Sequence, residues 1–361
     1  MSAFFAIGRY THPPHTAAPQ KDGIHIVRLD LESGKLSTIS RFDEAQNVSF
    51  FATAPGSDLL FAISELPNSV LNRFRLRWFD ARSTETGKME STPLLDLEAR
   101  SEFDDAGACY ISFTGNTAAI ACYDSGVVRL FDTTDKMASK QRIKLLECTD
   151  ELSERQEAPH AHCAVPWPGN PGVYAVADLG ADRIYKITDG VSTPEVVLQV
   201  EPGVGPRLLL FHPDRPIAFL VAELSNELLV LDVDGTNALK IRQRVSLIGY
   251  PDSTVSDTTS TIQNAAHIAL SKDGTRVIAS NRGKINDIVI FTLSAENTVE
   301  FTGIVPAGGI FPRSFEVVED KYIIVANQKS ASLVVYAVNG PTPVAVSSLT
   351  METPIAFQRL G

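Results

Sequence analysis

The segment RLLLFHPDRPIAFLVAE, residues Arg207–Glu223, decides the fold. It contains two apolar runs joined by a His-Pro-Asp turn, a pattern typical of two antiparallel strands in a hairpin. A third apolar run, NELLVLDV, follows it, and a more variable fourth run comes next. Hairpins of the same design begin at Ser49, Tyr110, His162, His267 and Arg313. Four antiparallel strands in each repeat of roughly 45–60 residues indicate the blades of a β-propeller.

The two ends of the chain supply a seventh blade. The runs FFAIGRY, GIHIVRLDL and KLSTISRF resemble the second, third and fourth strands of a blade, and PIAFQRL near the C-terminus resembles a first strand. Pairing them closes the ring and removes the open sheet edges. We therefore predict one all-β domain over residues 1–361, a seven-bladed β-propeller of four-stranded antiparallel blades. Three stretches look like insertions between strands and a fourth like a short helix: Leu66–Phe74, Asp80–Phe103 and Pro251–Gln263, and then Glu147–Gln156.

Composition and charge narrow the class of protein. Hydrophobic residues make up 44% of the chain and charged residues 21%, as in a globular protein with a large core. A formal charge of −11 without a basic run argues against a nucleic-acid partner. The four cysteines show no C-x-x-C spacing, and no apolar run approaches the ~18 residues of a membrane span. We expect reduced thiols, a cytoplasmic location and no membrane partner, while the oligomeric state is not specified.

Polar residues occupy the two ends of each predicted hairpin. In a propeller the first strand lines the central channel, so the start of this strand and the end of the second lie at one face. Convergent polar groups in such a mouth predict a binding site for a small anionic molecule. The alternative for any single position is a solvated strand end or a structural ion pair. The predicted pairs are Ser49 with Glu65, Tyr110 with Tyr123, His162 with Asp178, Arg207 with Glu223, His267 with Arg282, and Arg313 with Gln328.

Two histidines in the third hairpin are candidate metal ligands. His160 and His162 are two residues apart and would share one side of an extended strand. A zinc site needs further ligands, and no third carboxylate or cysteine is apparent beside them. We therefore predict no metal here.

Several stretches resemble the seven-bladed lactonase family, which includes bacterial propeller-type 6-phosphogluconolactonase and fungal 3-carboxy-cis,cis-muconate lactonizing enzyme. They are AIGRYT, HCAVPW, VADLGADRIY, GPRLLLFHPD, VAELSNELLVLDV and SNRGKINDIVIF, and the resemblance covers nearly the whole chain. It implies that no metal or organic cofactor is used. It also implies a set of four catalytic residues: His162, Arg207, Glu223 and Arg282.

Five more residues are predicted to bind the substrate: His160, His267, Arg313, Gln328 and Tyr110. Compared with the family, the chain departs at three positions. Tyr110 stands where many members have a histidine, His267 where an acidic residue is usual, and Arg9 where a small threonine is common. These departures predict a more basic pocket on one side.

The residue set predicts lactone hydrolysis, with His162 or Glu223 as the base. Arg207 and Arg282 would stabilise the developing oxyanion or bind a phosphate group of the substrate. The first alternative is a carboxymuconate cycloisomerase, which would use the same residue types to hold carboxylates and move a proton. The second alternative is a non-catalytic interaction scaffold like the WD-repeat propellers. Against the scaffold, the chain has only two tryptophans, Trp78 and Trp167, and neither precedes an aspartate.

Overall fold

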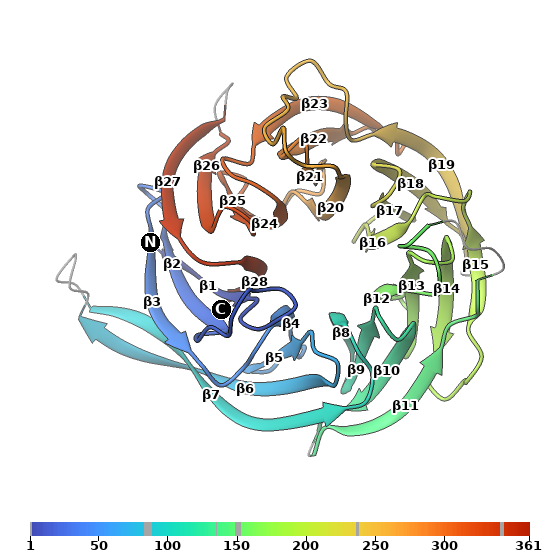
Figure 1. The fold of residues 1–361 in the computed structure, drawn as a ribbon, viewed down its shortest axis with the longest axis horizontal. Coiled ribbons are helices and arrows are strands. Elements are labelled where there is room, and N and C mark those ends of the chain that lie inside the picture. The colour runs from blue at the N-terminus through green and yellow to red at the C-terminus, as the bar shows by residue number, and fades with distance from the viewer. Residues whose placement is uncertain (1, 83–88, 135, 149–152, 236–237, 340–342) are drawn as a thin grey trace.

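The computed structural model shows seven four-stranded antiparallel sheets arranged as blades around a central channel (Figure 1). It describes residues 2–82, 89–134, 136–148, 153–235, 238–339 and 343–361. No helix occurs within these ranges. The predicted all-β, seven-bladed propeller is confirmed.

We number the blades in chain order, with the blade shared by the two ends as blade 7. Blades 1 to 3 contain β4 (Val48–Thr53), β5 (Leu59–Ser64), β6 (Ser69–Arg82) and β7 (Met89–Phe103), then β8 (Ala108–Thr114), β9 (Thr117–Cys122), β10 (Val127–Asp132) and β11 (Ala138–Lys144), and then β12 (Ala161–Pro166), β13 (Val173–Asp178), β14 (Arg183–Thr188) and β15 (Glu195–Gln199). Blades 4 and 5 contain β16 (Pro206–Phe211), β17 (Ile217–Ala222), β18 (Glu227–Val233) and β19 (Leu239–Ser246), and then β20 (Gln263–Leu270), β21 (Arg276–Gly283), β22 (Asp287–Leu293) and β23 (Val299–Pro306). Blades 6 and 7 contain β24 (Pro312–Val318), β25 (Tyr322–Asn327), β26 (Ser332–Ala337) and β27 (Val344–Thr350), and then β28 (Pro354–Leu360), β1 (Ser2–Arg9), β2 (Ile24–Asp30) and β3 (Leu36–Phe42).

Burial explains why the second strand of a blade is a continuous apolar run. All six residues of β17 are buried, because both faces of the strand are covered. The fourth strand of the same blade, β19, is mostly half-buried or exposed. The turn between β16 and β17 is held by His212, whose Nδ1 accepts hydrogen bonds from the backbone amides of Asp214 and Arg215. Such local side-chain bonds favour the tight turn over a longer strand.

Closure of the ring occurs as predicted. Strand β28 pairs antiparallel with β1, from Phe4 opposite Leu360 to Arg9 opposite Pro354. Arg9 is 5% exposed and donates from Nε to the carbonyl of Glu352 at 2.6 Å. The Arg9 guanidinium therefore holds the N-terminal and C-terminal segments of the closing blade together. It does not add a charge to the pocket, contrary to our expectation for this departure from the family.

Two of the predicted insertions are wrong. Leu66–Phe74 and Asp80–Phe103 belong largely to β6 and β7, two paired strands of 14 and 15 residues, although residues 83–88 lie outside the described part. Their charged, alternating sequences obscured them, because the solvated outer strands of a blade need no apolar run. Pro251–Gln263 is a loop, as predicted, except that Gln263 begins β20, and one isolated bridge joins Val255 to Ile285. Of Glu147–Gln156, residues 149–152 lie outside the described ranges, and the rest form no helix.

Candidate active site

Near the start of each first strand, its pairing with the second strand is interrupted by a break in register, which changes the direction of a side chain. In blade 4, Pro206 pairs with Ala222 and Leu208 with Val221, so Arg207 has no residue opposite it. A β-bulge of this kind turns the extra residue out of the regular alternation and is common beside active sites. In blade 5 the bulge holds Ala266 and His267. The bulge residues of the other blades are Ser49, Cys109, His162, Arg313 and Ile355.

The residue that follows each second strand is fixed beside the bulge. The backbone amide of Glu223 donates to the carbonyl of Gly205, two residues before the bulge, at 2.8 Å. Glu65, Tyr123, Leu179, Gln328 and Tyr10 make the same bond in their own blades. Arg282 pairs with Asn264 at the corresponding place. We refer to these seven positions together as the mouth ring: Tyr10, Glu65, Tyr123, Leu179, Glu223, Arg282 and Gln328.

Glu223 gathers the predicted catalytic residues around one buried carboxylate. Its side chain is 0% exposed, and Oε1 lies 3.0 Å from Nη2 of Arg282. Oε2 lies 2.8 Å from Nε of Arg207 and 3.9 Å from Nε2 of His162. Arg207 also donates from Nη1 to the carbonyl of Ala266. Four residues that span 120 positions of sequence, from His162 to Arg282, therefore meet at one point.

Burial and charge set the protonation states in this cluster. Burial raises the pKa of Glu223, but the attraction of Arg282, Arg207 and Arg155 outweighs it and leaves this pKa well below its ordinary value. Burial, with Arg207 nearby, holds the pKa of His162 well below 6.5. The imidazole is therefore neutral at neutral pH. Burial and the adjacent Arg282 lower the pKa of Arg207 to about 9, so this guanidinium is still a cation.

Arg155 is a member of the cluster that the sequence analysis missed. It lies in the turn before β12, and its Nη2 is 3.1 Å from Oε1 of Glu223. Its Nε donates to the Tyr123 hydroxyl at 3.0 Å. His160 stacks on the Tyr123 ring at 4.3 Å and shares a hydrogen bond with the Tyr123 carbonyl through Nδ1. His160 therefore borders the cluster and supports the tyrosine that orients Arg155.

Glu65 forms a second charged cluster in the mouth ring. The Tyr10 hydroxyl donates to its Oε2 at 2.6 Å, and Nη2 of Arg313 lies 3.4 Å from the same oxygen. His15 lies 3.7 Å from Oε1 and stacks on the ring of Tyr10. The Arg313 guanidinium also lies over Tyr10, at 5.2 Å from the ring centre. Arg313 was predicted as a site residue, whereas Tyr10 and His15 were not.

A family model described as "Lactonase, 7-bladed beta-propeller" matches residues 4–348. The chain belongs to this lactonase propeller family. It is 28% identical over 322 residues to 6-phosphogluconolactonase of Bacillus subtilis, with 87% of each chain covered. It is 24% identical to 6-phosphogluconolactonase of Formosa agariphila, with 87% of this chain and 88% of the relative covered.

Solved structures of similar fold cover the whole propeller. A putative 6-phosphogluconolactonase from Bacteroides uniformis has a TM-score of 0.80 at 25% identity, with 99% of each chain covered. The periplasmic gluconolactonase of Pseudomonas aeruginosa has a TM-score of 0.83 at 22% identity, with 100% of this chain and 99% of that one covered. The second likeness concerns the fold alone. Both confirm the predicted family resemblance at the level of architecture.

Three predicted residues of this lactonase-family chain are not drawn into either cluster. Tyr110 follows the bulge residue Cys109 and packs on Phe50 at 4.4 Å, and it is half-buried between the blades. His267 lines a separate channel pocket of about 250 Å³, where burial lowers its pKa to about 3. Gln328 occupies its mouth-ring position, and its buried Oε1 has no hydrogen-bond partner among the described residues.

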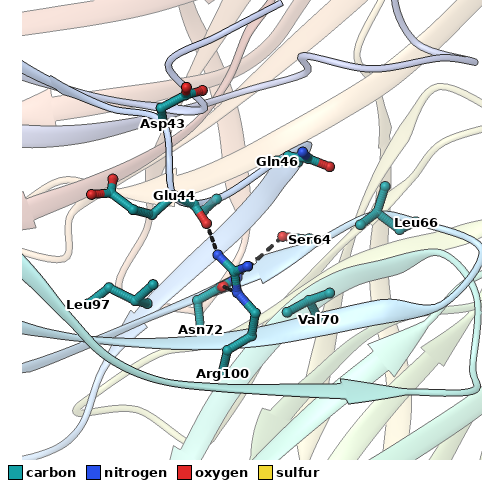
Figure 2. A pocket seen from close by; sticks show the side chains of 10 residues that line it. Asp43, Glu44, Gln46, Ser64, Leu66, Val70, Asn72, Leu97 and Arg100 are labelled. Atoms are coloured by element: carbon teal, nitrogen blue, oxygen red, sulfur yellow. Dashed lines mark hydrogen bonds between the residues drawn. The ribbon is translucent and has the colours of Figure 1, made fainter. Parts of the chain in front are cut away.

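Another pocket, of about 370 Å³, lies on the flank of blade 1 and contains none of the predicted residues (Figure 2). Arg100 crosses it and donates to the carbonyl of Glu44 and, at 3.0 Å, to Oδ1 of Asn72. Asn72 in turn donates to the hydroxyl of Ser64 at 3.3 Å. Because Ser64 directly precedes Glu65, this chain of bonds supports the backbone behind the second cluster.

Two further findings concern metals and membranes. Across the described ranges, no group of three or more His, Cys, Asp or Glu side chains has the arrangement of a metal site. The same residues include no helix of the length and apolarity that crossing a bilayer requires.

Proposed function

We propose that the chain is a lactonase that hydrolyses a small anionic sugar lactone of the 6-phosphogluconolactone type. The observation that carries the proposal is the meeting of a neutral His162 with two buried arginines, Arg207 and Arg282, on one carboxylate. Lactone hydrolysis needs a base for water and positive donors for the oxyanion, and this cluster offers both. Membership in the lactonase family and the names of the relatives support the same reaction.

The cluster favours His162 over Glu223 as the base. Three arginines bind the two oxygens of the Glu223 carboxylate, so it already has its counter-charges, whereas the His162 imidazole is neutral and can accept a proton. In our mechanism the His162 imidazole takes a proton from water while the water oxygen attacks the lactone carbonyl carbon. Arg207 and Arg282 stabilise the resulting oxyanion. The carbon–oxygen bond of the ring then breaks, and the imidazolium returns the proton to the departing ring oxygen, which becomes a hydroxyl.

The charge of the mouth supports an anionic substrate. Around Glu223, three arginines meet a single carboxylate, in a protein whose formal charge is −11. A local positive excess attracts anions into the mouth and guides them to bind there. The charged members of this cluster are Arg155, Arg207 and Arg282, with Glu223.

The alternatives receive less support. The relatives reported above are named for sugar lactones, so we do not favour the carboxymuconate cycloisomerase. An interaction scaffold has no use for a buried charge cluster of this kind, since desolvating three charged groups, Arg207, Arg282 and Glu223, is costly.

A direct assay tests the proposal. We expect the purified protein to hydrolyse 6-phosphoglucono-1,5-lactone above its spontaneous rate, and Arg207→Ala to lower kcat about 10²- to 10³-fold, as the loss of an oxyanion donor does. Glu227→Gln, a change on the outer part of the same blade, serves as the control. A wild-type rate equal to the spontaneous rate would overturn the proposal, and so would full activity of the Arg207 variant.

We also propose a cytoplasmic location. All four cysteines are free thiols, and Cys109, Cys122 and Cys163 are buried. Unpaired cysteines are typical of reducing compartments. Fractionation of the native source, with the protein followed by antibody, tests this. Recovery with secreted proteins would contradict it.

A further inference from the structure

Glu65 and Glu223 face each other across the channel mouth. They occupy equivalent mouth-ring positions in blades 1 and 4, and each is fixed by the same backbone bond at 2.8 Å. Consecutive blades contact one another around the ring, so these two blades stand on opposite sides of it (Figure 1). Arg313 lies within electrostatic reach of both carboxylates. A small molecule bound at Glu223 therefore extends towards Glu65.

The partners of Glu65 differ in kind from those of Glu223. Glu223 has three arginines, whereas Glu65 has one, Arg313, together with the Tyr10 hydroxyl and His15. Burial raises the pKa of Tyr10 well above 10, although the nearby Arg313 opposes this, so the hydroxyl donates as a neutral group. Burial lowers the pKa of His15, which leaves this imidazole uncharged at neutral pH. Glu65 is therefore a partly exposed carboxylate with spare capacity to accept hydrogen bonds.

The backbone that carries Glu65 is held on both sides. Its amide and carbonyl bond to Asn47, at 2.8 and 3.3 Å. Oδ1 of Asn47 also accepts the amides of Thr11 and His12, each at 2.8 Å, which ties the segment after Tyr10 to blade 1. Behind the strand, Arg100 supports Ser64 through Asn72 (Figure 2). A carboxylate held in this way loses little entropy when a ligand binds.

We propose that Glu65 is a specificity-determining residue of this mouth, which accepts hydrogen bonds from the ring hydroxyls of the lactone and repels ligands with a carboxylate at that end. The assignment rests on the proposed lactonase function. Ionised carboxylates are acceptors only, so they suit hydroxyl donors, and hydrogen bonds to a charged group are the stronger kind. A second carboxylate placed there meets a like charge. Glu65 thus selects polyhydroxylated lactones over the polycarboxylate lactones of the muconate type.

The experiment compares wild type and Glu65→Gln on three lactones. Glucono-1,5-lactone carries ring hydroxyls, δ-valerolactone carries none, and carboxymuconolactone carries carboxylates. We expect the substitution to lower kcat/KM for gluconolactone about 10- to 100-fold, mainly through KM, as the loss of a charge-assisted hydrogen bond does. The rate for δ-valerolactone should stay within about 3-fold, and carboxymuconolactone should bind more tightly, since a like charge is removed.

Glu98→Gln is the matched control, because it removes another arginine-paired carboxylate of blade 1, on the outer strand β7 and away from both clusters. It should leave all three lactones unchanged. An equal loss on every lactone in the Glu65 variant would overturn the proposal, because it would indicate a general structural effect, and so would an unchanged rate on gluconolactone.

Binding of D-gluconate, measured by calorimetry, separates this proposal from the lactonase proposal. If wild type binds gluconate and Glu65→Gln binds it at least about 10-fold more weakly, hydroxyl recognition stands even without turnover. If both proteins bind gluconate equally, or neither binds it, the role of Glu65 is refuted, whatever the outcome of the lactonase assay.

Discussion

Replacing Glu223 by glutamine should destabilise the protein as well as inactivate it. The carboxylate is 0% exposed and faces three guanidiniums, so Glu223→Gln leaves Arg207 and Arg282 buried without their counter-charge. Removing one partner of a buried ion pair costs about 3–5 kcal/mol. An unfolding entropy of about 2.1 cal/mol/K per residue over 361 residues is about 0.76 kcal/mol/K. We therefore expect Tm to fall by roughly 4–7 °C in differential scanning calorimetry.

The pH dependence of this difference tests its electrostatic origin. The folded-state pKa of Glu223 lies below the unfolded value of about 4.3, so its stabilisation is complete above that pH. It is lost as the pH falls from there through the folded-state pKa. The Tm difference should hold between pH 7 and about pH 5 and shrink in stronger acid.

The control for this experiment is a surface pair of the same blade. Glu227 lies 2.9 Å from Arg244, and both side chains are more than a fifth exposed. Exposed ion pairs contribute about 0–1 kcal/mol, so Glu227→Gln should move Tm by about 1 °C or less. Equal Tm values for wild type and Glu223→Gln at pH 7 would refute our account of the cluster.

Three other changes test separate parts of the argument. His162→Gln should lower kcat by about 10²- to 10⁴-fold. In wild type, kcat/KM should stay level from about pH 8 to below pH 6.5, because burial and Arg207 depress the pKa of His162. A fall in kcat/KM towards acid pH with a midpoint at or above 6.5 would contradict this. Arg155→Met should lower kcat/KM in the same lactone assay by about 10-fold, because one charged contact to Glu223 is lost. Wild-type activity of this variant would contradict a role for Arg155. Gly180→Ala should destabilise the protein by about 1–3 kcal/mol in urea unfolding, because the new Cβ would lie 1.8 Å from the carbonyl oxygen of Ala158. An unchanged unfolding midpoint would show that the backbone at Ala158 moves aside freely.

The hairpin pattern predicted the blades well but placed some site residues one position off. Apolar runs mark where a strand is, whereas a β-bulge adds a residue without changing the composition of the run. In blade 2 the bulge residue is Cys109, so the predicted Tyr110 turns between the blades. In blade 3, Asp178 pairs with Ala161, and Leu179 takes the mouth-ring position instead.

Residues outside the hairpins were harder to find. Arg155 lies in a turn without periodicity, and its partner Glu223 is 68 residues away. Tyr10 belongs to the divided blade, so its equivalence to Glu65 emerges only when the ring is closed. Conversely, four side chains could be predicted to lie at one face because each is within one residue of a strand end: Arg207, Glu223, Arg282 and Arg313.

Pairing of β28 with β1, the seam of the ring, is the step that completes the mouth. Arg9 and Glu352 bond across 343 positions of sequence, so blade 7 is the element with the greatest chain separation between partners. Such distant pairing is slow, since loop entropy is lost before the contact is made. Tyr10 follows directly on this seam and donates to Glu65. A nascent or partly opened ring therefore carries a complete Glu223 cluster but an unfinished opposite wall, and should bind its ligands without discrimination until the last strand docks.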